Sequence, residues 1–197
     1  MRTLIIIPVL LFSLLLGVPS YSADFNKGLT AAQNGDFATA LKEWKPLAEQ
    51  GNSRAQYNLG NMYLRGDGVP QDDKEAVYWY KLAAEQGDAK AQYNLGVMYD
   101  VGEGVPQDDK EAVRWYTLAA EQEHAKAQYN LGVMYALGEG VIKDYVYAHM
   151  WGNIASMNGN DKGETLRGYV AEKMTSSQIE EAQRLARECI KKNYKGC

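Results

Sequence analysis

The strongest constraint on this chain is an internal repeat. Residues 55–86 and 91–122 are almost identical, AQYNLG-x-MY-xx-G-x-GVPQDDKEAV-x-WY-x-LAAEQ, at an offset of 36 residues, and a third copy begins at residue 127. Glycine and tryptophan landmarks keep this spacing in all three copies: Gly60, Gly96 and Gly132, then Trp79, Trp115 and Trp151. A tandem array offers an extended surface, whereas a catalytic site usually needs one unrepeated group of residues. The repeat therefore favours a binding scaffold over an enzyme.

Each 36-residue unit is predicted to form two helices, which we call helix A and helix B. In the second copy, helix A follows Asp88 as its N-cap and ends at Gly102, a residue type suited to a left-handed C-cap. Its apolar residues recur at helical spacing. Helix B starts after a Gly-Val-Pro loop, with Asp108 or Asp109 as its cap. The predicted fold class is all-α, a solenoid of antiparallel helix pairs.

Glycine positions in the repeat predict how these helices pack and end. Gly96 falls inside helix A, where glycine costs about 1 kcal/mol relative to alanine. A close crossing of helix A and helix B, with no room for a Cβ atom, would explain it. Helix B of the first copy would close at Gly87, but the second copy has Glu123 at that position, so this C-cap is altered.

The two ends of the array differ from its middle, as terminal repeats of solenoids do. Residues 24–51 form a diverged N-terminal repeat, and the regular repeats cover about 52–87, 88–123 and 124–159. Residues 160–197 are predicted to form C-terminal capping helices, one around Thr165 to Lys173 and a last one after a capping box at Thr175 and Gln178. In the third copy, Gly152 occupies the place of Tyr80 and Tyr116.

Residues 1–23 have the pattern of a secretory signal peptide. Arg2 precedes an apolar run over residues 4–18, and the small residues Ser20, Ser22 and Ala23 suit signal peptidase. The run is short for a membrane span, and no second one follows, so we expect no integral membrane segment in the mature chain. The expected location is outside the cytoplasm, in a bacterial periplasm or secreted.

Charge and cysteine content narrow the function classes further. The net charge of −4 argues against a nucleic-acid partner, which would require a dense positive surface. Cys189 and Cys197 would lie roughly 12 Å apart in a continuous helix, whereas a disulfide needs Cα atoms within about 7 Å. If the last helix stops near Asn193 and the chain turns back at Gly196, an oxidising compartment favours a disulfide over two free thiols.

Positions that change between copies, while packing residues stay constant, are candidates for partner binding. We expect them to face solvent, with the second half of helix A lining the concave face of the array; the alternative is neutral drift at exposed positions. Tyr78 is the preferred exposed anchor, and most other tyrosines are expected to pack between helices. The candidates are Asn61, Leu64, Arg65, Tyr78, Val97, Asp100, Val101, Arg114, Val133, Ala136 and Leu137.

Nothing in the sequence indicates a catalytic, cofactor or metal site. His124 and His149 each occur in one copy and have no metal-ligand spacing to a partner. The Asp72-Asp73 and Asp108-Asp109 pairs are explained by helix capping and lack the spacing of a calcium loop. No nucleophile, zinc or phosphate-binding motif is present. We therefore predict no catalytic residues, no cofactor and no metal.

The pattern A-Q-Y-N-L-G-x-M-Y-x-x-G-x-G-V-P-Q-D-x-x-E-A-x-x-W-Y resembles the Sel-one-like repeat (SLR) family, relatives of the tetratricopeptide repeats. The resemblance covers residues 24 to about 159, and the tail from Met174 is similar to closing segments of bacterial members. It implies a right-handed α-solenoid that acts as an adaptor in protein assembly. A cysteine-rich branch of the family is linked to β-lactam binding or hydrolysis, but no repeat of this chain contains cysteine.

The leading hypothesis is an exported, non-enzymatic adaptor that binds a protein or peptide on its helix-lined surface. One alternative, argued from the cysteine-rich branch, is an envelope hydrolase acting on β-lactams or cell-wall fragments. Another is a secreted factor that engages host proteins. The sequence leaves the partner and the oligomeric state open.

Overall fold

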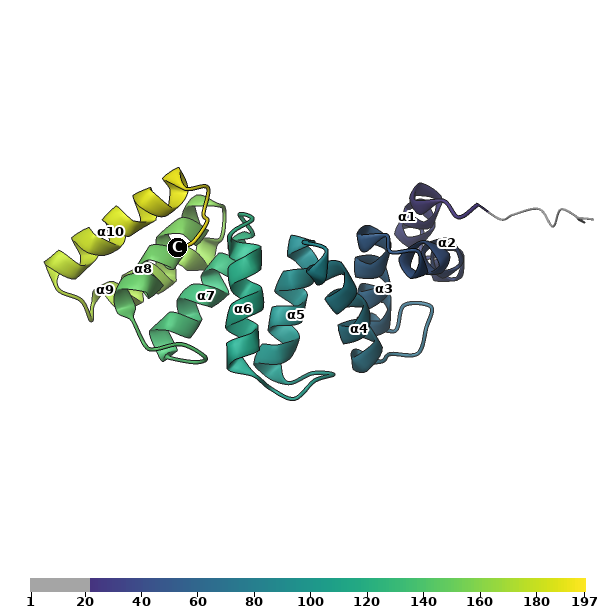
Figure 1. Cartoon of the computed structure of the whole chain (residues 1–197), viewed down its shortest axis with the longest axis horizontal. Helices are drawn as coiled ribbons and strands as arrows, with labels where there is room; N and C mark the ends of the chain where they lie inside the picture. The colour runs from purple at the N-terminus through teal and green to yellow at the C-terminus, as the bar shows by residue number, and fades with distance from the viewer. Residues whose placement is uncertain (1–21) are drawn as a thin grey trace, which may run out of the picture.

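A computed structural model describes residues 22–197, and all regular structure in this range is α-helical. Residues 1–21, most of the predicted signal peptide, lie outside the described residues. The helices form one elongated row, with α1 and the C-terminal helix α10 at opposite ends (Figure 1). Their bounds are α1 Phe25–Gln33, α2 Phe37–Glu49, α3 Ser53–Arg65, α4 Asp73–Glu85, α5 Ala89–Val101, α6 Asp109–Ala120, α7 Ala125–Leu137, α8 Tyr145–Met157, α9 Asp161–Ala171 and α10 Ser176–Lys191.

Local capping chemistry sets the ends of these helices. The Asp88 carboxylate accepts hydrogen bonds from the first backbone amides of α5, and Gly102 closes α5 in the left-handed conformation, as predicted. Asp108, rather than Asp109, caps α6. Glu123 follows α6 with a φ of +63°, so it adopts the left-handed conformation that Gly87 adopts after α4. A side chain at this φ carries a strain that glycine avoids.

Packing runs along the row and does not converge on one centre. Helix A of each regular repeat (α3, α5 and α7) pairs with its helix B (α4, α6 and α8), and each pair packs on the next. The buried apolar residues form three clusters that follow one another along the array and a fourth among α7, α8 and α9. The predicted solenoid of helix pairs is confirmed.

The glycine inside helix A has the predicted packing role. A Cβ atom built on Gly96 would lie 2.7 Å from Cδ1 of Tyr116, whose ring is fully buried in α6. Gly60 meets the ring of Tyr80 in the same way. The large side chain of helix B thus occupies the space that the glycine leaves, which allows the close crossing of the two helices.

The C-terminal cap is built around a different contact. α9 begins at Asp161, earlier than the predicted start near Thr165, because Asn160 caps its first turn. Gly152 in α8 lacks the tyrosine ring of the earlier repeats, and α9 packs in that space: a Cβ atom on Gly163 would lie 2.5 Å from the Gly152 carbonyl oxygen. α10 then packs against α8 and starts with the predicted capping box at Thr175 and Gln178.

The chain turns back after α10. Asn193 and Tyr194 both adopt positive φ, and Gly196 follows in the same region. The Sγ atoms of Cys189 and Cys197 are bonded, with their Cα atoms 5.5 Å apart. This disulfide ties the final residues to α10, whose Cys189 is buried against the core of the third repeat.

Candidate functional site

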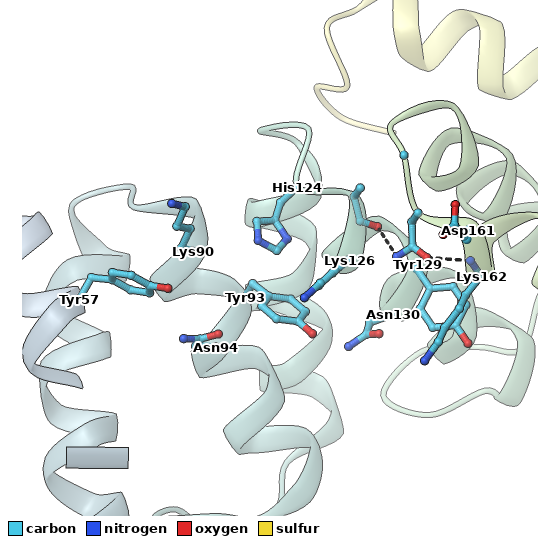
Figure 2. A pocket seen from close by; sticks show the side chains of 13 residues that line it. Tyr57, Lys90, Tyr93, Asn94, His124, Lys126, Tyr129, Asn130, Asp161 and Lys162 are labelled. Atoms are coloured by element: carbon cyan, nitrogen blue, oxygen red, sulfur yellow. Dashed lines mark hydrogen bonds between the residues drawn. The ribbon is translucent and has the colours of Figure 1, made fainter. Parts of the chain in front are cut away.

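A groove of about 810 Å³ runs across the array on the side of the helix-A N-termini (Figure 2). We call it the helix-A groove. It collects residues from the first halves of α3, α5 and α7 and from the start of α9, so three repeats and the cap contribute to one surface. Its lining residues are Tyr57, Lys90, Tyr93, Asn94, His124, Ala125, Lys126, Tyr129, Asn130, Gly159, Asn160, Asp161 and Lys162.

The polar side chains of the groove repeat with the array. α5 contributes a lysine, a tyrosine and an asparagine, and α7 contributes the same three residue types from the equivalent positions. Lys162 in α9 lies 36 residues after Lys126, which itself lies 36 residues after Lys90. α9 therefore occupies the position of a further helix A and continues the row of lysines.

His124 joins the groove to the start of α7. Its Nδ1 atom accepts a hydrogen bond from the Ala127 amide at 3.3 Å, and its ring stacks on Tyr93 with centroids 4.7 Å apart. Burial lowers the pKa of His124, and the nearby charge of Lys126 lowers it further. The imidazole therefore stays neutral at neutral pH, which leaves Nδ1 free to act as the N-cap acceptor.

Two of the variable positions serve the buried tyrosines of helix B. The Tyr80 hydroxyl donates to Oδ1 of Asn61 at 2.9 Å, and the Tyr116 hydroxyl donates to Oδ2 of Asp100 at 3.0 Å. Burial raises the pKa of both hydroxyls well above the usual value, so they keep their protons and need an acceptor.

The need of a buried tyrosine hydroxyl for an acceptor explains which residue types occupy these positions in each copy. In the second copy Val97 replaces the acceptor Asn61, and Asp100, one helical turn further along α5, accepts the hydrogen bond from the Tyr116 hydroxyl. In the third copy Gly152 removes the hydroxyl, and both positions, Val133 and Ala136, are apolar. Packing inside the array therefore explains these changes without a partner.

The remaining variable positions differ widely in exposure. Arg65, Arg114, Val101, Leu137 and Tyr78 are exposed, with Tyr78 at 53%. Leu64, Val97 and Val133 are half-buried and pack against the core. The expectation of solvent exposure is wrong for Ala136, which is 5% exposed because α9 packs over that part of the third repeat.

None of the eleven candidate positions lines the helix-A groove. The second half of helix A, which we expected to form the binding face, lies away from it, and the groove uses the first half instead. Tyr78 and Arg114 line two smaller hollows beside Trp79 and Trp115 on helix B. Partner contact at the exposed candidates stays a prediction.

A buried row of glutamines escaped the sequence analysis. Gln56, Gln92 and Gln128 each donate from Nε2 to a backbone oxygen near the end of the preceding helix B, at 2.9 to 3.0 Å. Their Oε1 atoms accept from a residue just after helix B of their own repeat, Gln86, Gln122 or Asn158. The sequence signal for this row is a glutamine that directly follows a buried alanine in each copy.

In residues 22–197, no three His, Cys, Asp or Glu side chains come together in a way that could hold a metal ion. No helix of the same range combines the length and apolar composition needed to cross a membrane.

Helix pairs stacked in a row around an open groove define the class of α-solenoid repeat proteins. The Sel1 repeat family matches this chain at residues 53–88, 89–124 and 125–160, each unit one residue later than the predicted boundaries. These matches cover more than half of the chain, and the chain belongs to the Sel1 repeat family. Sel1 repeats typically mediate protein–protein interaction.

Solved structures with the same fold include a Sel1 repeat protein from Oxalobacter formigenes, with 32% identity and a TM-score of 0.71; the alignment covers 84% of this chain and 75% of the other. Another is c5321, described as a protective antigen of uropathogenic Escherichia coli strains that displays an SLR fold, with 31% identity and a TM-score of 0.53. That alignment covers 86% of this chain and 46% of the other.

Two curated relatives are named exopolysaccharide production negative regulator. The protein of Rhizobium leguminosarum bv. viciae is 41% identical over 56 residues, 28% of this chain and 21% of the relative. The protein of Rhizobium meliloti (strain 1021) is 36% identical over 58 residues, 29% of this chain and 22% of the relative. This chain thus matches only about a fifth of the length of these relatives.

Proposed function

We propose that this protein is an exported adaptor that holds a partner protein in the helix-A groove and catalyses no reaction. The observation that carries the proposal is that one groove takes side chains from three successive repeats and from α9. A surface assembled across repeats suits an extended partner, because each repeat can contribute the same contacts to the next part of that partner.

The N-terminal end of the array supports the export part of this proposal. Predicted cleavage after Ala23 would leave Asp24 as the first residue, directly before α1. The backbone nitrogen of Asp24 donates to Oε2 of Glu43 at 3.0 Å, and this glutamate is 1% exposed. The other oxygen of this carboxylate, Oε1, already pairs with Nζ of Lys27 at 2.6 Å, and Oε2 would add a second charged contact with a positively charged N-terminus at Asp24.

The disulfide supports the same compartment. A bond between Cys189 and Cys197 is stable in an oxidising environment, whereas the cytosol keeps most thiols reduced.

Crosslinking tests the adaptor role. A tagged chain with its own signal segment is expressed in a bacterial host, crosslinked in intact cells and recovered from the envelope fraction. We expect one or a few defined protein adducts, and a mature protein whose first residue is Asp24 by N-terminal sequencing. Recovery in the cytoplasm with residues 1–23 retained would contradict export. The absence of any adduct, together with hydrolysis of nitrocefin or muropeptides, would contradict the adaptor role.

A further inference from the structure

We propose that the helix-A groove binds an extended acidic segment of a protein, with acidic side chains at least three residues apart facing Lys90, Lys126 and Lys162 in turn. This inference rests on the proposed adaptor function and adds to it the chemistry and the spacing of the bound segment.

The groove is a positive site on an acidic protein. The whole chain carries a net charge of −4, yet the groove contains three exposed lysines and Asp161 as the acidic residue among its lining side chains. Across residues 22–197, Lys90, Lys126 and Lys162 take part in none of the salt bridges. Such lysines attract carboxylates, and burial of part of a ligand beside them strengthens the attraction.

Two further features add to this positive potential. α7 and α9 begin at the groove with His124 and Asn160 as N-caps, and helix N-termini carry a partial positive charge, which the Asp88 carboxylate offsets at the start of α5. Lys90 and Lys126 lie on either side of His124 in the groove (Figure 2).

The lysines have a spacing that an extended peptide can match. They recur at intervals of 36 residues, so each belongs to the equivalent first turn of successive helices on one side of the array (Figure 2). Successive helices A are separated by a helix B, since α5 and α7 each pack on α6. A helix with its side chains is about 10 Å across, and an extended chain advances about 3.3 Å per residue, so at least three residues of peptide span one repeat.

Asparagines in the groove can hold the peptide backbone between these charges. Asn94 in α5 and Asn130 in α7 occupy equivalent positions of successive repeats, and both line the groove. Each amide has an oxygen that can accept an N–H. A peptide offers one N–H at every residue as a donor to these oxygens. A polysaccharide acid offers regular hydroxyl donors as well, so the proposed adaptor function is what favours a protein segment.

The test uses two fluorescein-labelled synthetic peptides of nine residues with the same composition, three glutamates among serine and alanine. One has a glutamate at every third position, and the other has its three glutamates in a row. Fluorescence anisotropy measures their binding to the folded chain. We expect tighter binding of the spaced peptide, weakened by raising the salt concentration from 50 to 300 mM.

Matched lysine variants locate the binding. Each exposed lysine–carboxylate pair contributes about a 2- to 5-fold change in affinity, so Lys90→Ala, Lys126→Ala and Lys162→Ala combined should weaken binding of the spaced peptide by about 10- to 100-fold. The control combines Lys74→Ala, Lys81→Ala and Lys110→Ala, which removes the same charge from exposed helix-B positions outside the groove. The control should change affinity less than two-fold, and circular dichroism shows that both variants fold.

Several outcomes would overturn the inference. Equal losses in the two triple variants would mean that net charge alone drives binding. Equal affinity for both peptides would remove the spacing argument, and tighter binding of an oligogalacturonate than of either peptide would assign the groove to an acidic polysaccharide. In the crosslinking experiment, a variant without the three groove lysines that keeps the wild-type adduct overturns this inference, because the partner then needs no lysine–carboxylate contact, and leaves the adaptor function intact. Wild-type protein without any adduct overturns the adaptor function itself.

Discussion

Replacement of Gln92 by leucine should weaken the junction between two repeats. Gln92 is 4% exposed, and its Nε2 atom donates to the Ala84 carbonyl oxygen at 3.0 Å in a buried contact. Its Oε1 atom accepts from Gln122 at 2.8 Å. Leucine keeps most of the volume and removes both hydrogen bonds, so the Ala84 oxygen stays buried without this donor.

The size of the effect follows from these two contacts. The Ala84 oxygen still accepts from the Gly87 amide at 3.0 Å, so the loss of the Gln92 bond costs about 0.5–1.5 kcal/mol, and the lost bond to Gln122 adds about 0.5–1 kcal/mol because water can replace it. The burial of a leucine instead of an amide offsets part of this cost. We expect the free energy of unfolding to fall by about 1–2 kcal/mol for Gln92→Leu, which corresponds to about 2–8 °C in Tm.

Urea denaturation and hydrogen exchange measure this effect at two levels. Repeat arrays can unfold in parts. We therefore expect Gln92→Leu to speed amide exchange relative to the wild type more at the junction of α4 and α5 than in α9 and α10. Gln122→Ala is the matched control, since it removes the exposed partner only, and it should cost about 0.5 kcal/mol. If Gln92→Leu destabilises the protein no more than this control does, the buried glutamine row is not what holds the repeats together.

Three further predictions concern packing, backbone strain and pH. Gly96→Val should lower the free energy of unfolding by about 1–3 kcal/mol through overpacking. A higher Tm for Gly96→Val than for Tyr78→Ala would contradict the assignment of Gly96 to the interior and Tyr78 to the surface. Glu123→Gly should raise the free energy of unfolding by about 1 kcal/mol in urea titrations, since it relieves the left-handed strain; a lower value would contradict this reasoning. Burial lowers the pKa of both His124 and His149, so the unfolded chain binds protons more readily as pH falls below about 6.5. Stability should therefore decline from pH 7 to pH 5, and His124→Asn should remove part of this decline in melts at each pH, with the remainder assigned to His149.

Helix positions and their pairing could be predicted from the chain because these features depend on neighbours in sequence. Asp88 and Gly102 bound α5 through backbone contacts within a few residues. Gly96 and Tyr116 meet inside one repeat, and the same pair of residue types recurs as Gly60 and Tyr80, so the pattern itself pointed to their contact.

The role of the variable positions could not be predicted in this way. Asn61 and Asp100 both differ from their counterparts in the next copy, and a comparison of copies treats them as free to vary. Each instead accepts a hydrogen bond from a buried tyrosine of the same repeat, from positions one helical turn apart. A helix offers two neighbouring turns from which an acceptor can reach the same hydroxyl, so the partner can move while the bond persists.

Periodicity alone was enough to establish a row of helix pairs, the caps that end them and the glycines that let them cross, because those interactions are local and are repeated with the residues. The groove depended on how repeats stack: its lysines lie 36 residues apart in sequence and share a surface only after the pairs pack side by side. The place of α9 depended on the same stacking, since Gly152 and Gly163 permit a close contact that neither residue specifies alone. Contacts between residues distant in sequence depend on how the helices pack, and this packing is defined only in the folded array.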